Sequence, residues 1–101
     1  MRQQPTALGW IDAELTRAPE WDAARIRQLA RRLGYLLEWP REGSVLPLVD
    51  QVREAEADAL IIPAPDHLDP ITLNAVMHYG DVESVNPRLS FARWSIIGAQ
   101  G

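Results

Sequence analysis

The stretch from 60 to 70, LIIPAPDHLDP, is where side chains capable of chemistry are densest. Asp66 and His67 follow an apolar run directly, and two further carboxylates, Asp12 and Glu14, follow an earlier apolar run. Carboxylate oxygens are the ligands that Mg²⁺ prefers in proteins. If Asp12, Glu14 and Asp66 converge, they form an acidic pocket, and a Mg²⁺-dependent small-molecule enzyme becomes one candidate function.

The same stretch also has a purely architectural interpretation. Pro63 and Pro65 favour an extended exit from a buried strand. Asp69 followed by Pro70 is typical of a helix start, because the carboxylate accepts from the N–H of Thr72 and proline suits the first helical position. On this interpretation the acidic residues are helix caps or solvated loop groups.

Other catalytic and metal-binding arrangements are missing from the sequence. There is no cysteine, and His67 and His78 stand eleven positions apart, so a zinc site would need carboxylates to complete it. All ten basic residues are arginine, which removes lysine chemistry. No glycine-rich phosphate loop follows the first apolar run, whose continuation is WIDAELTRAPEW. We therefore expect no resident cofactor and no bound metal.

The elements that position these residues alternate between apolar runs and helical periodicity, which indicates an α/β fold. We predict strands at 6–12, 35–39, 59–62, 82–85 and 88–97. We predict helices from Pro19 to a C-cap at Gly34, from a cap at Ser44 with a buried stripe that includes Val45, and over 70–79. This order implies a three-layer sandwich with a mostly parallel sheet of four to five strands, in a single domain over 1–101.

Composition narrows the class of protein further. The net charge is −4 and the pI is near 5.0, so the chain as a whole repels a phosphate backbone. No apolar run approaches the roughly 20 residues that span a bilayer, and the first ten residues lack a signal-peptide core. We expect a cytoplasmic protein without membrane contact.

Two groups of side chains are candidates for binding a macromolecule. The predicted first helix carries an arginine run that is either a basic face for nucleic acid or a solvated face paired with acidic neighbours. That run is Arg25, Arg27, Arg31 and Arg32. Tryptophan is enriched at interaction hot spots, and four are many for this length. They are Trp10, Trp21, Trp39 and Trp94.

Taken in order, several segments resemble the catalytic domain of the serine recombinases, the resolvases and DNA invertases. GWIDAE at 9–14 stands where that family has a G-Y-x-R-V-S strand, and RQLARRLGY at 27–35 matches the end of its first helix. ADALII followed by APDHLDP stands in the place of a strand that leads into D-R-L-x-R. The resemblance covers about 7–86 and implies a resolvase-like, flavodoxin-like topology.

At the family's catalytic positions this chain differs. Glu14 stands for the serine nucleophile and Asp12 for an arginine, while His67 and Pro70 replace the two arginines after Asp66. Phosphoryl transfer needs positive groups around the phosphate, so these replacements predict that DNA cleavage is lost. The residues after 86 are too few for the family's long dimerisation helix. We therefore expect a non-enzyme that acts through protein–protein contacts, with a regulatory or assembly role in a bacterium or phage, and that forms a homodimer through its last strand and exposed tryptophans.

Overall fold

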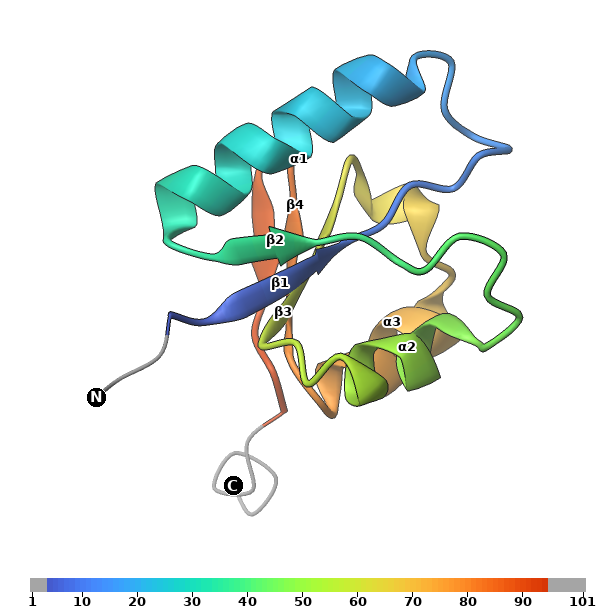
Figure 1. Ribbon diagram of the computed structural model, residues 1–101, viewed down its shortest axis with the longest axis vertical. Helices are drawn as coiled ribbons and strands as arrows, with labels where there is room; N and C mark the ends of the chain where they lie inside the picture. Colours follow the sequence, from blue (N-terminus) through green and yellow to red (C-terminus); the bar gives the residue numbers. More distant parts are fainter. Residues whose placement is uncertain (1–3, 95–101) are drawn as a thin grey trace.

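The computed structural model describes residues 4–94, which form one five-stranded sheet between two layers of helices (Figure 1). In chain order the elements are β1 (Thr6–Gly9), α1 (Pro19–Leu33), β2 (Leu36–Glu38), α2 (Leu48–Glu54), β3 (Ala59–Ile62), the 3₁₀ turn η1 (Pro65–His67), α3 (Pro70–Met77), β4 (Asp81–Ser84) and β5 (Leu89–Phe91). The predicted α/β class and the alternation of strands and helices are confirmed.

The strand order in the sheet is β2-β1-β3-β4-β5. The first four strands run parallel, and β5 pairs antiparallel with β4. All four residues of β3 are buried, as expected of a central parallel strand that is covered on both faces. The sheet is therefore mostly parallel, with one antiparallel edge.

Helix α1 covers one face of the sheet, and α2 and α3 cover the other (Figure 1). Because successive side chains of a strand point to opposite faces, β3 sends Leu60 and Ile62 towards α2 and α3, and Ala59 and Ile61 towards α1. Two separate hydrophobic cores result, one on each side of the sheet.

Helix α1 starts and ends where its sequence signals predict. Pro19 is its first residue, and Glu20 and Asp22 stand in the first turn, where acidic side chains interact favourably with the helix dipole. Gly34 ends the helix with φ +85°, a conformation that glycine adopts without strain. No helix within residues 4–94 is long and apolar enough to cross a membrane.

The prediction for the second helix is wrong at its start. Val45 was expected in the buried stripe, but α2 begins at Leu48 and the side chain of Val45 is 96% exposed. Pro47 explains the difference, because a proline disfavours helical backbone at the residue before it. The hydroxyl of Ser44 accepts a hydrogen bond from the N–H of Leu46 at 3.3 Å, which closes a turn and caps no helix.

The strand predictions hold in position but are too long at several ends. The strand predicted over 6–12 ends at Gly9, since the chain turns at Asp12, whose carbonyl accepts from the N–H groups of Leu15 and Thr16. The final strand predicted over 88–97 is confirmed only as Leu89–Phe91.

The chain leaves β5 because the residues after it bond elsewhere. The N–H of Arg93 donates to the carboxylate of Asp81 at 2.7 Å, and the N–H of Trp94 donates to the carbonyl of Met77 in α3 at 2.8 Å. The end of the described chain is therefore attached to the C-terminus of α3. Positions 95–97 of the predicted strand lie outside the described residues.

Burial of β3 gives a direct test of this architecture. Leu60 is fully buried, whereas Leu36 lies in edge strand β2 of the same sheet and is 53% exposed. We expect Leu60→Ala to lower the free energy of unfolding by about 2–5 kcal/mol. The matched change Leu36→Ala should cost less than about 1 kcal/mol. Urea denaturation followed by circular dichroism measures both, and equal losses would contradict the assigned strand order.

Candidate functional site

The carboxyl ends of β1 and β3 meet where the strand order reverses, which is where open α/β sheets place their ligands. The loops that follow these two strands are bonded together. Just after the paired residues of β1 and β3, the N–H of Trp10 donates to the carbonyl of Ile61 at 2.9 Å. The N–H of Asp12 then donates to Nδ1 of His67, also at 2.9 Å. Two of the predicted site residues, Asp12 and His67, thus lie together, and the hydrogen bond between them comes from the backbone N–H of Asp12.

His67 serves as the link between the two loops. Its side chain is buried, and because Nδ1 accepts a hydrogen bond, the proton of the neutral ring must lie on Nε2. His67 lines a pocket of about 330 Å³ together with Trp10, Asp12 and Asp66. A buried, bonded histidine of this kind stabilises a loop, and His78 lies apart from it, exposed at the end of α3.

The predicted convergence of three carboxylates is wrong. Asp12 and Asp66 line the same pocket, but Glu14 does not reach it. The Asp12 carboxylate instead accepts from the backbone N–H of Glu14 at 2.9 Å, a local turn contact that fixes the loop after β1. Among residues 4–94, no three His, Asp or Glu side chains lie close enough together to hold a metal ion. Within these residues, Asp12, Glu14 and Asp66 therefore do not form the acidic pocket that the sequence suggested.

Asp69 and Pro70 form the helix cap that the sequence indicates. Oδ1 of Asp69 accepts from the N–H of Thr72 at 2.8 Å, and Oδ2 accepts from its hydroxyl at 2.9 Å. The backbone hydrogen bond from Thr72, followed by the bond from its hydroxyl, lowers the pKa of the Asp69 carboxyl below its ordinary value. Pro70 is the first residue of α3. Asp69 and Pro70 therefore have a structural role at the start of α3.

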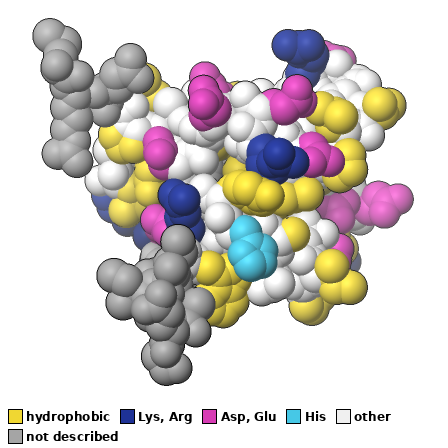
Figure 2. All heavy atoms as spheres, turned by 90° about the horizontal axis from the view of Figure 1, so that it is seen from below, with side chains coloured by type: hydrophobic (Ala, Val, Ile, Leu, Met, Phe, Trp, Pro, Cys, Tyr) yellow, Lys and Arg dark blue, Asp and Glu magenta, His cyan; other side chains and the backbone are white. Residues whose placement is uncertain are grey.

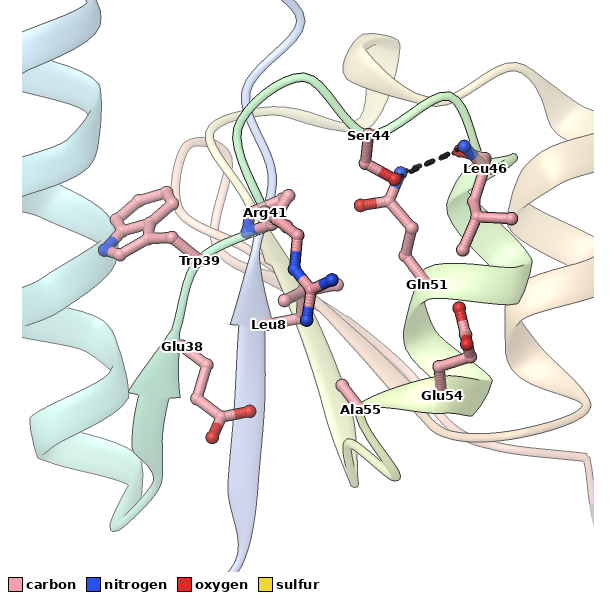
Figure 3. Close-up of a pocket in the computed structure, with 10 residues that line it drawn as sticks. Leu8, Glu38, Trp39, Arg41, Ser44, Leu46, Gln51, Glu54 and Ala55 are labelled. Atoms are coloured by element: carbon pink, nitrogen blue, oxygen red, sulfur yellow. Dashed lines mark hydrogen bonds between the residues drawn. The ribbon is translucent and has the colours of Figure 1, made fainter.

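Another hollow lies between β2 and α2, and its polar residues were not predicted from the sequence. It encloses about 610 Å³ over Leu8. Figure 3 shows Arg41, from the segment after β2, extending over the space between Glu38 and the α2 residues Gln51 and Glu54. No acidic partner of Arg41 lies within 4.0 Å in the part of the chain described. One cation between two carboxylates makes the hollow suitable for a polar ligand.

Little in the sequence indicates this groove. Its walls come from two elements about ten positions apart, and a single arginine between Pro40 and Gly43 carries no motif. The strand predicted over 35–39 places the following residues at a strand end. Which of their side chains faces α2 depends on the path that the chain takes after β2.

The four tryptophans have different environments. Trp10 is half-buried and packs against the core on the α2 and α3 side. Trp39 lines the groove, and its ring lies on the α1 side (Figure 3), over Gly9, where an added Cβ would lie 2.6 Å from the ring. Trp21 on α1 and Trp94 after β5 are more than half exposed. Only these last two remain strong candidates for contact with a partner.

The four arginines of α1 do not share one face. Arg25 and Arg32 line a hollow beside the turn between β4 and β5, whereas Arg27 and Arg31 are exposed and do not line it. At 100° per residue, Arg25 and Arg27 point about 160° apart. The prediction of a single basic face is therefore wrong.

Beneath α1 the sheet carries an acidic region. Burial raises the pKa of the Tyr35 phenol, and the nearby carboxylates of Asp81, Glu83 and Asp58 raise it further. Tyr35 consequently stays protonated, and it packs against the α1-side core as a neutral group.

Comparison of the chain with protein-family models, with curated proteins and with solved structures finds no match. Support for a function of this protein therefore comes from its own residues.

The capping role of Asp69 can be separated from a ligand-binding role. Asp69→Ala should lower the urea midpoint at pH 7, whereas Asp69→Asn should keep most of the stability because asparagine also caps helices. A carboxyl with a lowered pKa contributes stability that is complete above its ordinary pKa and is lost as the pH falls through the lowered value. The gap between wild type and Asp69→Ala should therefore close in acid.

Asp66→Ala is the matched control, since Asp66 is exposed three positions earlier on the same loop. Its urea midpoint should equal that of the wild type at every pH. A loss as large as that of Asp69→Ala would show that the loop is not held by the cap.

Proposed function

We propose that this chain is a non-catalytic, resolvase-like α/β domain that acts through protein–protein contacts, beginning with a second copy of itself. The strand order 2-1-3-4-5 is that of flavodoxin-like sheets, and it supports the resemblance of the sequence to the serine recombinases. Residues at the family's catalytic positions make structural contacts: Asp12 and His67 join two loops, and Pro70 begins a helix. On its composition, we place the protein in the cytoplasm of a bacterium or of a phage-infected cell.

The observation that carries this proposal is the surface of α3. This helix, PITLNAVM, contains no charged residue, although it lies in the outer layer of the fold (Figure 1). Ile71 is 82% exposed, and Asn74 and His78 lie along the same side of the helix at intervals of three and four residues. An exposed apolar side chain on a helix face without charges is typical of an interaction surface. We infer that this side of α3 is covered in an assembly.

Trp94 extends the same surface. Its indole Nε1 donates to Oδ1 of Asn74 at 3.1 Å, and its ring lies 6.5 Å from the ring of His78. Figure 2, which views the molecule from the side of α2 and α3, shows hydrophobic side chains gathered around the histidine on this face. Ile71, Asn74, His78 and Trp94 are called the α3 surface below.

Self-association fits the charges and the sheet edge beside this surface. The protein carries a net charge of −4, so two copies repel unless the contact itself is free of like charges, as the α3 surface is. Strand β5 lies next to it at the end of the sheet, with no strand on its outer side within residues 4–94. A two-fold contact places the same uncharged residues of both copies opposite one another.

The dimer is tested by placing a charge on the α3 surface. Ile71→Arg should convert the dimer to a monomer, because an arginine there would be buried without a partner. Sedimentation equilibrium over a range of protein concentrations measures the mass, and the association constant should fall by at least about a hundredfold, as expected for loss of a central contact.

Val45→Arg is the matched control, since it introduces the same charge at another exposed β-branched residue outside the α3 surface. It should associate like the wild type. A wild-type protein that is monomeric at all concentrations, or equal effects of both substitutions, would contradict the proposed contact.

The lack of catalysis gives a second test. The purified protein should leave supercoiled plasmid intact with or without millimolar Mg²⁺, because phosphoryl transfer needs positive groups and Asp12 and Glu14 stand at two of the positions that the resemblance makes catalytic. Agarose gel electrophoresis detects single breaks. Breaks that disappear in Glu14→Ala, beside an unaffected Glu20→Ala control, would show that the loop after β1 is catalytic.

A further inference from the structure

The hollow between α1 and the turn that joins β4 to β5 gathers positive charge on a protein that is acidic overall. It encloses about 270 Å³ and is lined by Trp21, Arg25, Gln28 and Arg32 from α1 and by Arg88 from the turn. Residues 21, 25, 28 and 32 recur at intervals of three and four, so they form one stripe along the helix. The hollow lies on the opposite side of the sheet from the α3 surface (Figure 1).

Two of the three guanidinium groups here have no acidic partner. Arg88 pairs with the buried carboxylate of Glu83 at 3.0 Å and donates to the carbonyl of Leu89 at 2.8 Å. Within residues 4–94 the other ion pair joins Arg53 to Asp50, which leaves Arg25 and Arg32 unpaired. Arg88 therefore balances Glu83, and the hollow keeps about two positive charges for a ligand.

Trp21 adds an aromatic surface at the end of the stripe. Its side chain is 63% exposed, and the guanidinium of Arg25 lies 5.8 Å from the centre of its ring. An exposed ring beside unpaired arginines is the combination with which proteins hold single-stranded nucleic acid, where bases stack on aromatic rings and arginines contact phosphates. A double helix, whose bases are already stacked, does not use the ring.

We propose that this hollow binds single-stranded nucleic acid, with one base on Trp21 and neighbouring phosphates on Arg25 and Arg32. Because the rest of the protein repels polyanions, binding is local and short. About two phosphates are neutralised, so the logarithm of the association constant falls with the logarithm of salt concentration with a slope near −1.4. The proposal does not depend on the dimer.

Fluorescence anisotropy of a labelled twelve-residue oligothymidylate, titrated with the full chain at several salt concentrations, tests the proposal. We expect saturable binding at low salt with this slope. The double variant Arg25→Ala/Arg32→Ala should lose about tenfold in affinity and most of the salt dependence. Trp21→Ala should lose about tenfold while keeping the slope, because it removes stacking and no charge.

Arg27→Ala/Arg31→Ala is the matched control, with the same change in charge on the same helix. It should bind within about twofold of the wild type, and so should Ile71→Arg, which separates this site from the α3 surface. Alanine favours helix at all four positions, and Arg88 is left intact so that Glu83 keeps its partner.

Four results would overturn the proposal. They are no binding at low salt, equal losses in the two arginine pairs, tighter binding of a duplex of the same length, and an affinity that Trp21→Ala leaves unchanged. In the last case the hollow would be a site for simple anions, which competition by inorganic pyrophosphate would show.

Discussion

The burial of β3 on both faces is the constraint on which the rest of the structure depends. A strand whose four residues are all buried must lie between other strands and between helices on both sides. With β1 on one side and β4 on the other, the loops after β1 and β3 leave the same edge of the sheet. Their meeting at Asp12 and His67 follows from that placement.

At that edge, polar residues form hydrogen bonds that fix the loops after β1 and β3. The N–H of Asp12 donates to the ring of His67, and the carboxylate of Asp12 accepts from the N–H of Glu14. The carboxylate of Asp69 accepts from the N–H of Thr72 in the first turn of α3. Each contact removes a backbone or side-chain group from those that a substrate would need. Hydrogen bonds therefore order this edge, and among residues 4–94 no three His, Asp or Glu side chains lie close enough together there to hold a metal ion.

Local signals in the sequence predicted the local structure well. Pro19, Gly34 and the pair Asp69–Pro70 mark helix ends through backbone geometry that does not depend on the rest of the fold, and all three are confirmed. The prediction of a helix start was wrong where a neighbouring residue determined the backbone conformation. Pro47 delayed the start of α2 through its effect on the preceding residue.

Side chains that act together across elements were harder to predict. Glu14 was expected beside Asp66 because both follow strands, but a turn after Gly9 directs it elsewhere. The four arginines of α1 lie within eight residues of one another and were expected to share a face, whereas helix rotation separates them into two pairs. Arg41 became visible as a groove residue only through the packing of α2 beside β2.

The two helical layers present contrasting surfaces. On one side, α3 is uncharged and carries exposed Ile71 beside Trp94; on the other, α1 carries unpaired arginines beside Trp21. An uncharged surface suits contact between copies of an acidic protein, and a local basic stripe suits a polyanion. The two proposed contact surfaces thus lie on opposite sides of the sheet, apart from the strand-end loops whose polar residues bond to one another.

Because the chain contains no cysteine, one introduced thiol reports directly on which surface meets another copy. His78→Cys, on the α3 surface, and Arg31→Cys, on the outer side of α1, can each be treated with a short bismaleimide under dilute conditions. We expect a covalent dimer from His78→Cys and almost none from Arg31→Cys. Equal cross-linking at both positions, or none at His78→Cys, would contradict the claim that the α3 surface is where this protein makes its contacts.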